Sequence, residues 1–348
     1  SAEATAPGVR IANQLSDVIR SPASDVVIMA GINDAFAGYS LQQITAAYYD
    51  VLRQATDAGL RVWLVTQPTM NSSHGSYSTD AQGRVFAINE WCRQQASATW
   101  ARFGLVLVDG AAAAVDASSA TGNWRANGSQ DNLHPRNVGA YWIGKEWARM
   151  LSLYVPDRNI LVSSNADNYA YSQRSVNLAP NGVFATGSGT ATGYTGTAIV
   201  GGASTNSLVS HTDGFGNWQQ MVQTASAAND GYHMACASVH ANGLVAGDIV
   251  QAACEVDVSS MTNCMGDQLQ LVANGATASK GSWDGYIDTA ADTALPEAYR
   301  VTRLTPWVKI EGAPSSVYAR VTTYYSGAGG ATVKMGRFSL RKLGAFFG

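Results

Sequence analysis

Asp131 and His134 are the residues of this chain whose types and spacing best suit acid–base chemistry. They lie three positions apart at the end of a polar loop, and Pro135 follows and fixes φ at the exit of that loop. On a turn, the carboxylate can bond to one ring nitrogen, which leaves the other nitrogen free to accept a proton from a nucleophile. The alternative is structural: Asp131 caps a turn, and His134 is a residue at the entry of a helix.

A second polar stretch, Gly31-Ile32-Asn33-Asp34, ends a run of five apolar residues, 26–30. Such a run is typical of a buried strand, and ligands of parallel α/β sheets bind outside the carboxyl ends of the strands. Gly, Asn and Asp are also ordinary turn residues, so a plain turn is one interpretation. The other is that Asn33 is held at the rim of a sheet for a chemical purpose.

Together the two motifs resemble those of the SGNH (GDSL-type) hydrolase family, over roughly residues 1–154. The resemblance implies a flavodoxin-like α/β fold with esterase, acetylesterase or lipase activity and no metal or organic cofactor. It also implies roles for single residues: His134 is the general base, Asp131 orients it, and Asn33 donates to the oxyanion, with Gly31 setting the turn. An amide aimed at a developing oxyanion is a known stabiliser, worth about 3–4 kcal/mol when it is lost.

The nucleophile of that family is a serine in a Gly-Asp-Ser motif, and the 30 residues before Gly31 contain no such motif. We expect this serine to precede Ser1, in a segment that was removed from a longer chain. Two alternatives stay open. The chain is a degenerate relative that binds without hydrolysis, or a different serine acts near His74, namely Ser72, Ser73 or Ser76. His74 itself either shapes a substrate pocket or is a solvated residue of its loop.

Helices and strands alternate over the first half of the chain, which predicts a parallel sheet with helices on both faces. Short strands are expected at 61–65 and 105–108, with Asp109 capping the segment that follows the second. A helix is expected to begin after Ser40, where Gln43 completes a capping box, and to end at Gly59. A second helix is expected around 85–92, ending near Gly104, and a last one over 138–154 with Asn137 as its N-cap.

The rhythm changes after residue 156. Apolar residues then alternate with a period of two, as at 252–258 and 317–321, and Asn-Gly pairs give turn signals. This pattern predicts an all-β, jelly-roll-like sandwich over 157–348, behind a partial esterase domain at 1–156. The sandwich weakly resembles carbohydrate-binding modules and the β-domains of phage tail proteins. Its aromatic residues could stack on sugar rings or pack in the core; the candidates for sugar binding are Trp218, Trp283 and Trp307.

Composition excludes several classes of protein. The chain carries 25 acidic and 22 basic residues, which argues against a nucleic-acid binder. No window approaches the ~18 apolar residues of a membrane span, and no signal peptide is visible at the start. The four cysteines lack metal-site spacing, and Cys254 and Cys264 are either buried thiols or a pair on neighbouring strands.

The sequence therefore predicts a serine esterase that removes O-acetyl groups from a polysaccharide, in an extracellular or virion-associated protein. Two alternatives from different classes remain. One is a non-catalytic glycan-binding module that carries a relic hydrolase domain. The second is a structural phage tail protein whose sandwich forms a contact in a homo-oligomer.

Overall fold

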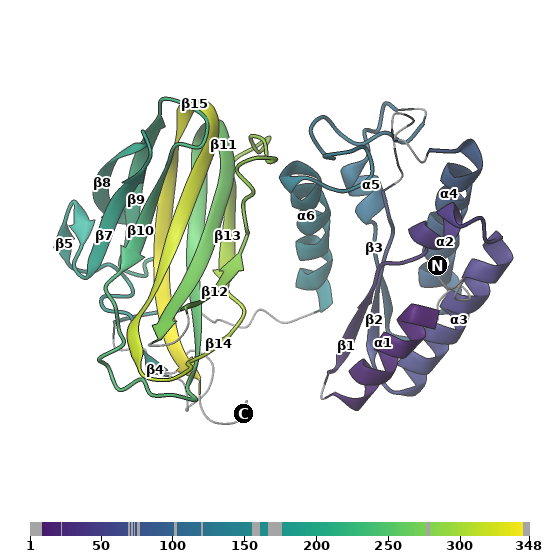
Figure 1. Cartoon of the computed structure of the whole chain (residues 1–348), viewed down its shortest axis with the longest axis horizontal. Coiled ribbons are helices and arrows are strands. Elements are labelled where there is room, and N and C mark those ends of the chain that lie inside the picture. Colours follow the sequence, from purple (N-terminus) through teal and green to yellow (C-terminus); the bar gives the residue numbers. More distant parts are fainter. Residues whose placement is uncertain are drawn as a thin grey trace. The chain divides into compact units, whose positions relative to one another are not determined.

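The structure is a computed structural model that describes residues 9–343, except 22, 69, 71, 73, 75–76, 101–102, 120, 155–160, 166–175 and 276–278. The chain forms two compact units, Ser1–Pro156 and Asp157–Gly348. The first unit combines helices with a small sheet, and the second is built from β-strands (Figure 1). No described helix is long and apolar enough to cross a membrane.

A parallel sheet of three strands forms the centre of the first unit. Its order is β1-β2-β3, with Ile28 paired to Leu64 and Leu64 to Leu107. The strands are β1 (Asp25–Ile28), β2 (Arg61–Val65) and β3 (Leu105–Val108). The helices of this unit are α1 (Val9–Arg20), α2 (Ile32–Phe36), α3 (Leu41–Asp57), α4 (Thr79–Gln94), α5 (Gly110–Ala114) and α6 (Asn137–Tyr154). The predicted flavodoxin-like alternation of strands and helices is confirmed.

Local sequence explains where these helices begin and end. Ser40 and Gln43 form the complete capping box at the start of α3, and Gly59 takes the left-handed φ of 77° just after its end. The end of α4 differs from the prediction. This helix ends at Gln94, a single π-turn, η1 (Gln95–Thr99), follows, and Gly104 instead makes the left-handed entry to β3 with φ 81°.

Helices cover the two faces of the sheet unequally. One face shares a core with α1, α3 and α4, whose apolar positions repeat at helical spacing. On the other face α6 packs against the sheet through Trp147, Met150 and Leu151, which meet residues of β2 and β3 such as Trp63. No described helix covers β1 in this way: Val27 is 51 % exposed, although its register partner Trp63 is buried.

The second unit is an antiparallel sandwich whose two longest strands, β11 (Ile249–Gly275) and β15 (Pro314–Leu343), take part in both layers. In one layer, residues 264–275 of β11 pair with β12 (Ser279–Asp284) and with residues 314–325 of β15. The latter pair with β10 (Gly231–Cys236), which pairs with β7 (Tyr194–Ile199).

The other layer uses the remaining parts of the two long strands. Residues 249–258 of β11 pair with β13 (Tyr299–Leu304), with β14 (Val308–Lys309) and with residues 332–343 of β15. β15 is followed in this layer by β9 (Asn217–Ala225) and β8 (Ala203–Ser210). Short strands complete the unit: β4 (Val176–Asn177), β5 (Gly187–Ser188) and β6 (Thr190–Ala191).

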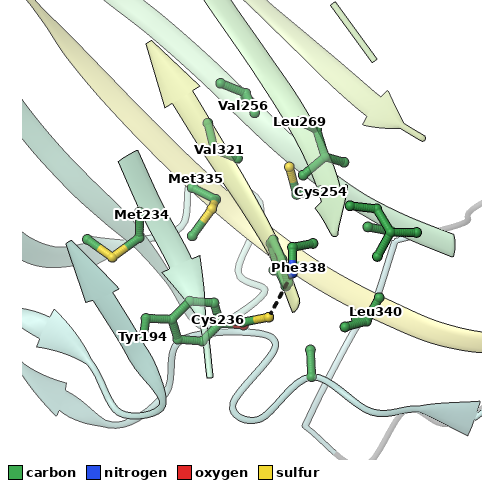
Figure 2. Packing of buried hydrophobic residues seen from close by; sticks show 14 of the residues in the cluster. Tyr194, Met234, Cys236, Cys254, Val256, Leu269, Val321, Met335, Phe338 and Leu340 are labelled. Carbon is green, nitrogen blue, oxygen red and sulfur yellow. Dashed lines mark hydrogen bonds between the residues drawn. The ribbon is translucent and has the colours of Figure 1, made fainter. Parts of the chain in front are cut away.

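Residues predicted to alternate along these strands fill the core between the layers. Val256, Leu269, Val321 and Met335 are all at most 1 % exposed, and Figure 2 shows them converging from β11 and β15. The predicted β-sandwich is thus confirmed. All four cysteines are free and buried, so Cys254 and Cys264 are ordinary core thiols rather than a disulfide.

Candidate active site

Polar residues join two strands of the first unit, β2 and β3, at their carboxyl ends. Thr66, which follows β2, donates to Asp109 after β3 over 2.7 Å and accepts from the Ala111 N–H. Asp109 also accepts from the Ala112 N–H, so it caps α5 as predicted, and Arg93 holds its two oxygens at 2.8 and 2.9 Å. These bonds fix the edge of the sheet on which the candidate catalytic loops rest.

Asp131 and His134 contact each other directly. The Asp131 Oδ2 lies 2.7 Å from His134 Nδ1, while its Oδ1 accepts from the backbone N–H groups of Leu133 and His134 at 3.0 and 2.7 Å. Asn132 adopts the left-handed φ of 69° that closes this tight turn. Each carboxylate oxygen therefore has its own task, one holding the backbone turn and the other the imidazole ring.

Hydrogen bonds keep the Asp131 carboxylate ionised. Its partial burial raises the pKa, but the bonds from the His134 ring and from two backbone N–H groups outweigh burial and hold the pKa well below its usual range. A carboxylate facing Nδ1 favours the tautomer with the proton on that nitrogen. His134 Nε2 is then an acceptor, and the side chain is 63 % exposed, so a nucleophile can reach it.

The loop that carries this pair is bonded to α5 and is closed by a bond of its own just before α6. Arg125 donates from its backbone to the Ala114 carbonyl and from its side chain to the Ala113 carbonyl, both in α5. At the far end the Arg136 N–H donates to the Gly128 carbonyl over 2.9 Å. Because α5 begins at the carboxyl end of β3, the loop lies at the active edge of the sheet.

Gly139 allows this loop to approach α6 closely. A Cβ added there would lie 2.1 Å from the Gly128 carbonyl oxygen and 2.7 Å from the Trp124 ring. The sequence could have indicated this contact, because Gly139 lies in the first turn of a long helix. A glycine in a helix lowers the stability by about 1 kcal/mol relative to alanine, so its presence usually has a packing reason. This positioning residue was not among those predicted from the sequence.

We expect Gly139→Ala to lower the free energy of unfolding and any activity of the His134 site together, because the added methyl must push the Gly128 backbone away. Gly144→Ala is the matched control in the same helix, since nothing lies within 4 Å of a Cβ at Gly144. The control should be neutral or more stable by up to about 1 kcal/mol. Thermal unfolding of both variants checks this, and equal midpoints would contradict the close approach.

Asn33 follows β1 at the carboxyl edge of the sheet, as Thr66 follows β2 and Asp109 follows β3. Gly31 takes φ 98° and begins the short helix α2, so the expected turn is a helix start, and Asn33 lies in its first turn. The Asn33 side chain is exposed and makes no hydrogen bond within the part of the chain that the structure describes. Its amide is therefore available to an external acceptor. Figure 1 shows α2 and α5 at the same end of the sheet.

Tyr48 fixes the backbone just before this turn. From the sequence, Tyr48 was expected only to be a buried residue of its helix. Its hydroxyl donates to the Ala30 carbonyl and accepts from the Ala30 N–H. A Cβ at Gly31 would lie 3.3 Å from the Tyr48 ring. Both the left-handed φ and this close contact therefore require glycine at position 31.

A comparison with protein families gives a match to the first unit. Residues 3–141 match the GDSL-like lipase/acylhydrolase family. The match lies within the first unit and covers less than half of the chain, and it confirms the resemblance that the two motifs suggested. A search of curated proteins found no match.

Solved structures resemble each half of the chain at low identity. A GDSL-like lipase from Bacteroides thetaiotaomicron is 16 % identical over 43 % of this chain and 72 % of that one, with a TM-score of 0.38. A carbohydrate-binding module of the β-sandwich superfamily is 10 % identical over 44 % of this chain (TM-score 0.31), and the chain spans 58 % of its length. A xylan-binding domain from Paenibacillus barcinonensis is 16 % identical over 47 % and 92 % of the two chains (TM-score 0.29).

The other candidates of the first unit, His74 and the serines around it, belong to the loop that follows β2. His74 is partly exposed, and its carbonyl accepts from the Tyr77 N–H over 2.9 Å. Ser73 and Ser76, two of the alternative nucleophiles, lie outside the described residues. Ser72 is exposed in the same loop.

The three candidate tryptophans of the sandwich differ in exposure. Trp283 and Trp307 are 41 % and 56 % exposed, so both remain candidates for sugar stacking. Trp218 is 1 % exposed, because its ring stacks on His211 at 4.1 Å and Arg300 lies over it. The prediction that Trp218 is available for sugar binding was wrong, since large aromatic side chains are also prime core residues.

One cluster in the sandwich has the donor types of a metal site. His211, Asp213 and Glu255 place ligand atoms within 4.8 Å of one another. Arg300, however, donates to both carboxylates, and His211 Nε2 lies 3.0 Å from Glu255. The guanidinium therefore supplies the positive charge, and we interpret the cluster as an ion-pair network that joins the loop after β8 to β11 and β13.

Proposed function

We propose that this protein is a serine-type ester hydrolase in which His134 acts as general base and then acid, Asp131 orients it, and Asn33 stabilises the tetrahedral oxyanion. The family match supports hydrolase chemistry in general. The residue roles rest on one observation above the others, the 2.7 Å contact between Asp131 Oδ2 and His134 Nδ1 with Nε2 left accessible. That geometry suits proton transfer from a hydroxyl nucleophile.

The open edge of β1 supports a nucleophile that precedes residue 1. Among the described residues β1 pairs only with β2, and Val27 and Met29 beside it are 51 % and 54 % exposed. Parallel sheets are normally covered on both faces, and bare apolar edges are avoided. A further strand along this edge would pair with β1 and shield both side chains.

Chain topology points to the same edge. α1 lies on the face that also carries α3 and α4, and these two helices connect β1 to β2 and β2 to β3. Crossover connections between parallel strands are right-handed, so helices on one face of the sheet advance the strand order in one direction. A strand that preceded α1 would therefore lie next to β1, on the side away from β2. A serine at the carboxyl end of that strand would lie beside the turn that carries Asn33, as nucleophilic catalysis requires.

The substrate we propose is an O-acetyl ester on a polysaccharide, and we place the protein outside the cell or on a virion. The support is the joining of the hydrolase-type unit to a β-sandwich with exposed aromatic residues. With both units in one chain, the sandwich would bind a glycan while the first unit removes acyl groups from it.

The test uses the product of the whole gene, including any residues that precede Ser1, with p-nitrophenyl acetate and acetylated xylan as substrates. We expect ester hydrolysis, and we expect Asn33→Ala to lower kcat about 10²–10³-fold because one oxyanion donor is lost. Asn242→Ala, at an exposed asparagine of the sandwich, is a control of the same chemical type. Absence of hydrolysis by the whole gene product, or an Asn33→Ala variant as active as the control, would refute the proposal.

A further inference from the structure

The outward face of one sandwich layer carries a row of polar and aromatic side chains that the proposed hydrolase site does not use. Strand register aligns five residues across β12, β11, β15, β10 and β7: Trp283, Gln270, Arg320, Ala235 and Thr195. Their neighbours along the strands, such as Leu269, Val321 and Met234, point into the core and are at most 1 % exposed. We call these five residues the Trp283 row.

A second row lies next to it on the same face. Gln268, Thr322, His233 and Thr197 are cross-strand partners two positions away along each strand. Opposed residues of adjacent strands have Cβ atoms about 4.5–5.5 Å apart, so each row is a continuous line of side chains. With strands ~4.8 Å apart, the five-strand Trp283 row extends over roughly 19 Å.

Trp283 presents a flat apolar surface at one end of its row. A Cβ at Gly281 would lie 3.3 and 3.4 Å from two carbons of the Trp283 ring, so the ring lies over Gly281 along β12. The side chain is still 41 % exposed. Glycine therefore lets the indole lie close to the strand, with part of its surface open to solvent.

The polar side chains of the two rows have unused hydrogen-bonding capacity. Arg320 donates from Nε to Gln270 over 2.7 Å, and its two Nη groups make no hydrogen bond to a described residue. Buried atoms without a partner among the described residues include His233 Nδ1 and Thr322 Oγ1, and Thr322 is 1 % exposed. Native proteins leave few such atoms unpaired, and because these two atoms have no exposed surface, an ordered water inside the sandwich is the partner that fits them.

The chemistry of this face matches one kind of occupant. Of the nine residues in the two rows, Arg320 alone carries a fixed charge. Burial lowers the pKa of His233, and the nearby charge of Arg320 lowers it further, so the His233 ring is neutral at pH 7. Amides, hydroxyls and an imidazole suit hydroxyl groups, and an indole suits the apolar face of a sugar ring. A membrane surface would need several cations, and a protein partner would need a larger apolar centre.

We propose that the Trp283 row, together with His233 and Thr197 of the adjacent row, forms a binding site for a polysaccharide chain that runs across the five strands. Gln268 and Thr322 of the adjacent row are buried and do not line this site. Trp283 stacks on one sugar ring, while Arg320, Gln270 and His233 bind hydroxyl or carboxylate groups of the following sugars. This site works independently of the His134 site, because it needs no chemical step.

The test is binding of the full chain to an immobilised array of neutral and uronic-acid-containing plant and bacterial polysaccharides. We expect retention on at least one glycan, with Trp283→Ala and Arg320→Gln each weakening binding about tenfold or more, which corresponds to 1.4 kcal/mol per factor of ten. Phe86→Ala, of similar exposure in α4, and Lys334→Gln, in the other layer, are the matched controls and should bind like the parent chain.

Thr322→Val is a control for folding. It removes a hydroxyl that is buried and has no partner among the described residues, so we expect an unchanged or higher melting temperature and binding like that of the parent chain. No retention on any glycan would overturn the proposal, as would equal loss in the row variants and the controls. Because no ester is hydrolysed in this assay, its outcome is independent of whether the His134 site is active.

Discussion

Replacement of His134 by alanine is expected to lower ester hydrolysis by the whole gene product roughly 10⁴-fold or more, because the general base is lost. His134 is 63 % exposed and contributes its ring to one side-chain bond, so the fold should persist. The measurement is kcat/KM for p-nitrophenyl acetate alongside a thermal melt. His240→Ala, a change of the same kind in the sandwich, is the control and should keep full activity.

Asp131→Asn refines this test. The amide oxygen can still accept from the backbone N–H groups of Leu133 and His134, so the turn is expected to survive. The amide N–H₂ would face His134 Nδ1 and favour the tautomer with the proton on Nε2, which cannot accept one from a nucleophile. We expect about 10⁴-fold loss of activity. The melting temperature should fall, because the ionised carboxylate stabilises the turn, but the variant should remain folded. Activity within a factor of ten of the parent would remove Asp131 from the proposed mechanism.

Acidification offers a further measurement of the same pair. The pKa of Asp131 is lowered in the folded protein, so this carboxylate stabilises the fold above its ordinary pKa near 3.9, and the stabilisation is lost as pH falls below that value. Asp131 is therefore ionised over the mildly acidic range. Loss of activity between pH 7 and 5, in a profile of kcat/KM against pH, would thus come from protonation of a group other than Asp131.

The second large effect is expected in the sandwich, where Asp267→Asn should destabilise the fold by about 3–5 kcal/mol. Asp267 is 1 % exposed and holds Arg303 with both oxygens at 3.0 Å, and Tyr299 donates to it over 2.6 Å. Burial lowers the pKa of Arg303, but the charge and bonds of Asp267 outweigh burial and raise it. Without the carboxylate, a buried guanidinium would lose its main partner.

Calorimetry should show this as a fall of roughly 6–20 °C in the melting temperature of the sandwich, at about 2–4 °C per kcal/mol. Asp257→Asn is the control on the same strand. Asp257 pairs with Lys334 at 3.8 Å near the surface, and partly exposed pairs contribute about 0–1 kcal/mol. If the two variants melted together, the buried pair would not have the importance that its geometry suggests.

Sequence reasoning reached the folds of both units for a physical reason. The face of an element that meets the core sets the burial pattern along its sequence. Burial repeats every second residue in strands, as at Val256, Leu269 and Val321, and at helical spacing in helices, as at Ile44 and Tyr48. The Asp131–His134 contact was foreseeable as well, because three residues on a tight turn bring the two side chains within reach by local geometry alone. Short-range features of this kind need little knowledge of the rest of the chain.

Long-range features followed only from the tertiary structure. Trp218 and Trp283 look alike in the sequence, yet Gly336 and the loop after β8 bury the first, while the second lies on an outward face. The role of Gly139 depends on Gly128, and the open edge of β1 depends on which strands pair with it. Contacts of this kind join residues far apart in the chain, so no local periodicity reports them.

The sequence by itself thus determined the two fold classes, the GDSL-type motifs and the local geometry of the Asp131–His134 turn, because these depend on neighbouring residues and on burial pattern. Only the tertiary structure decided which aromatic residues are accessible, how α6 admits the loop that carries Asp131 and His134, and that Trp283, Gln270 and Arg320 form one line. That line depends on the pairing of β12, β11 and β15, and strand register is fixed by the packing of the whole sandwich.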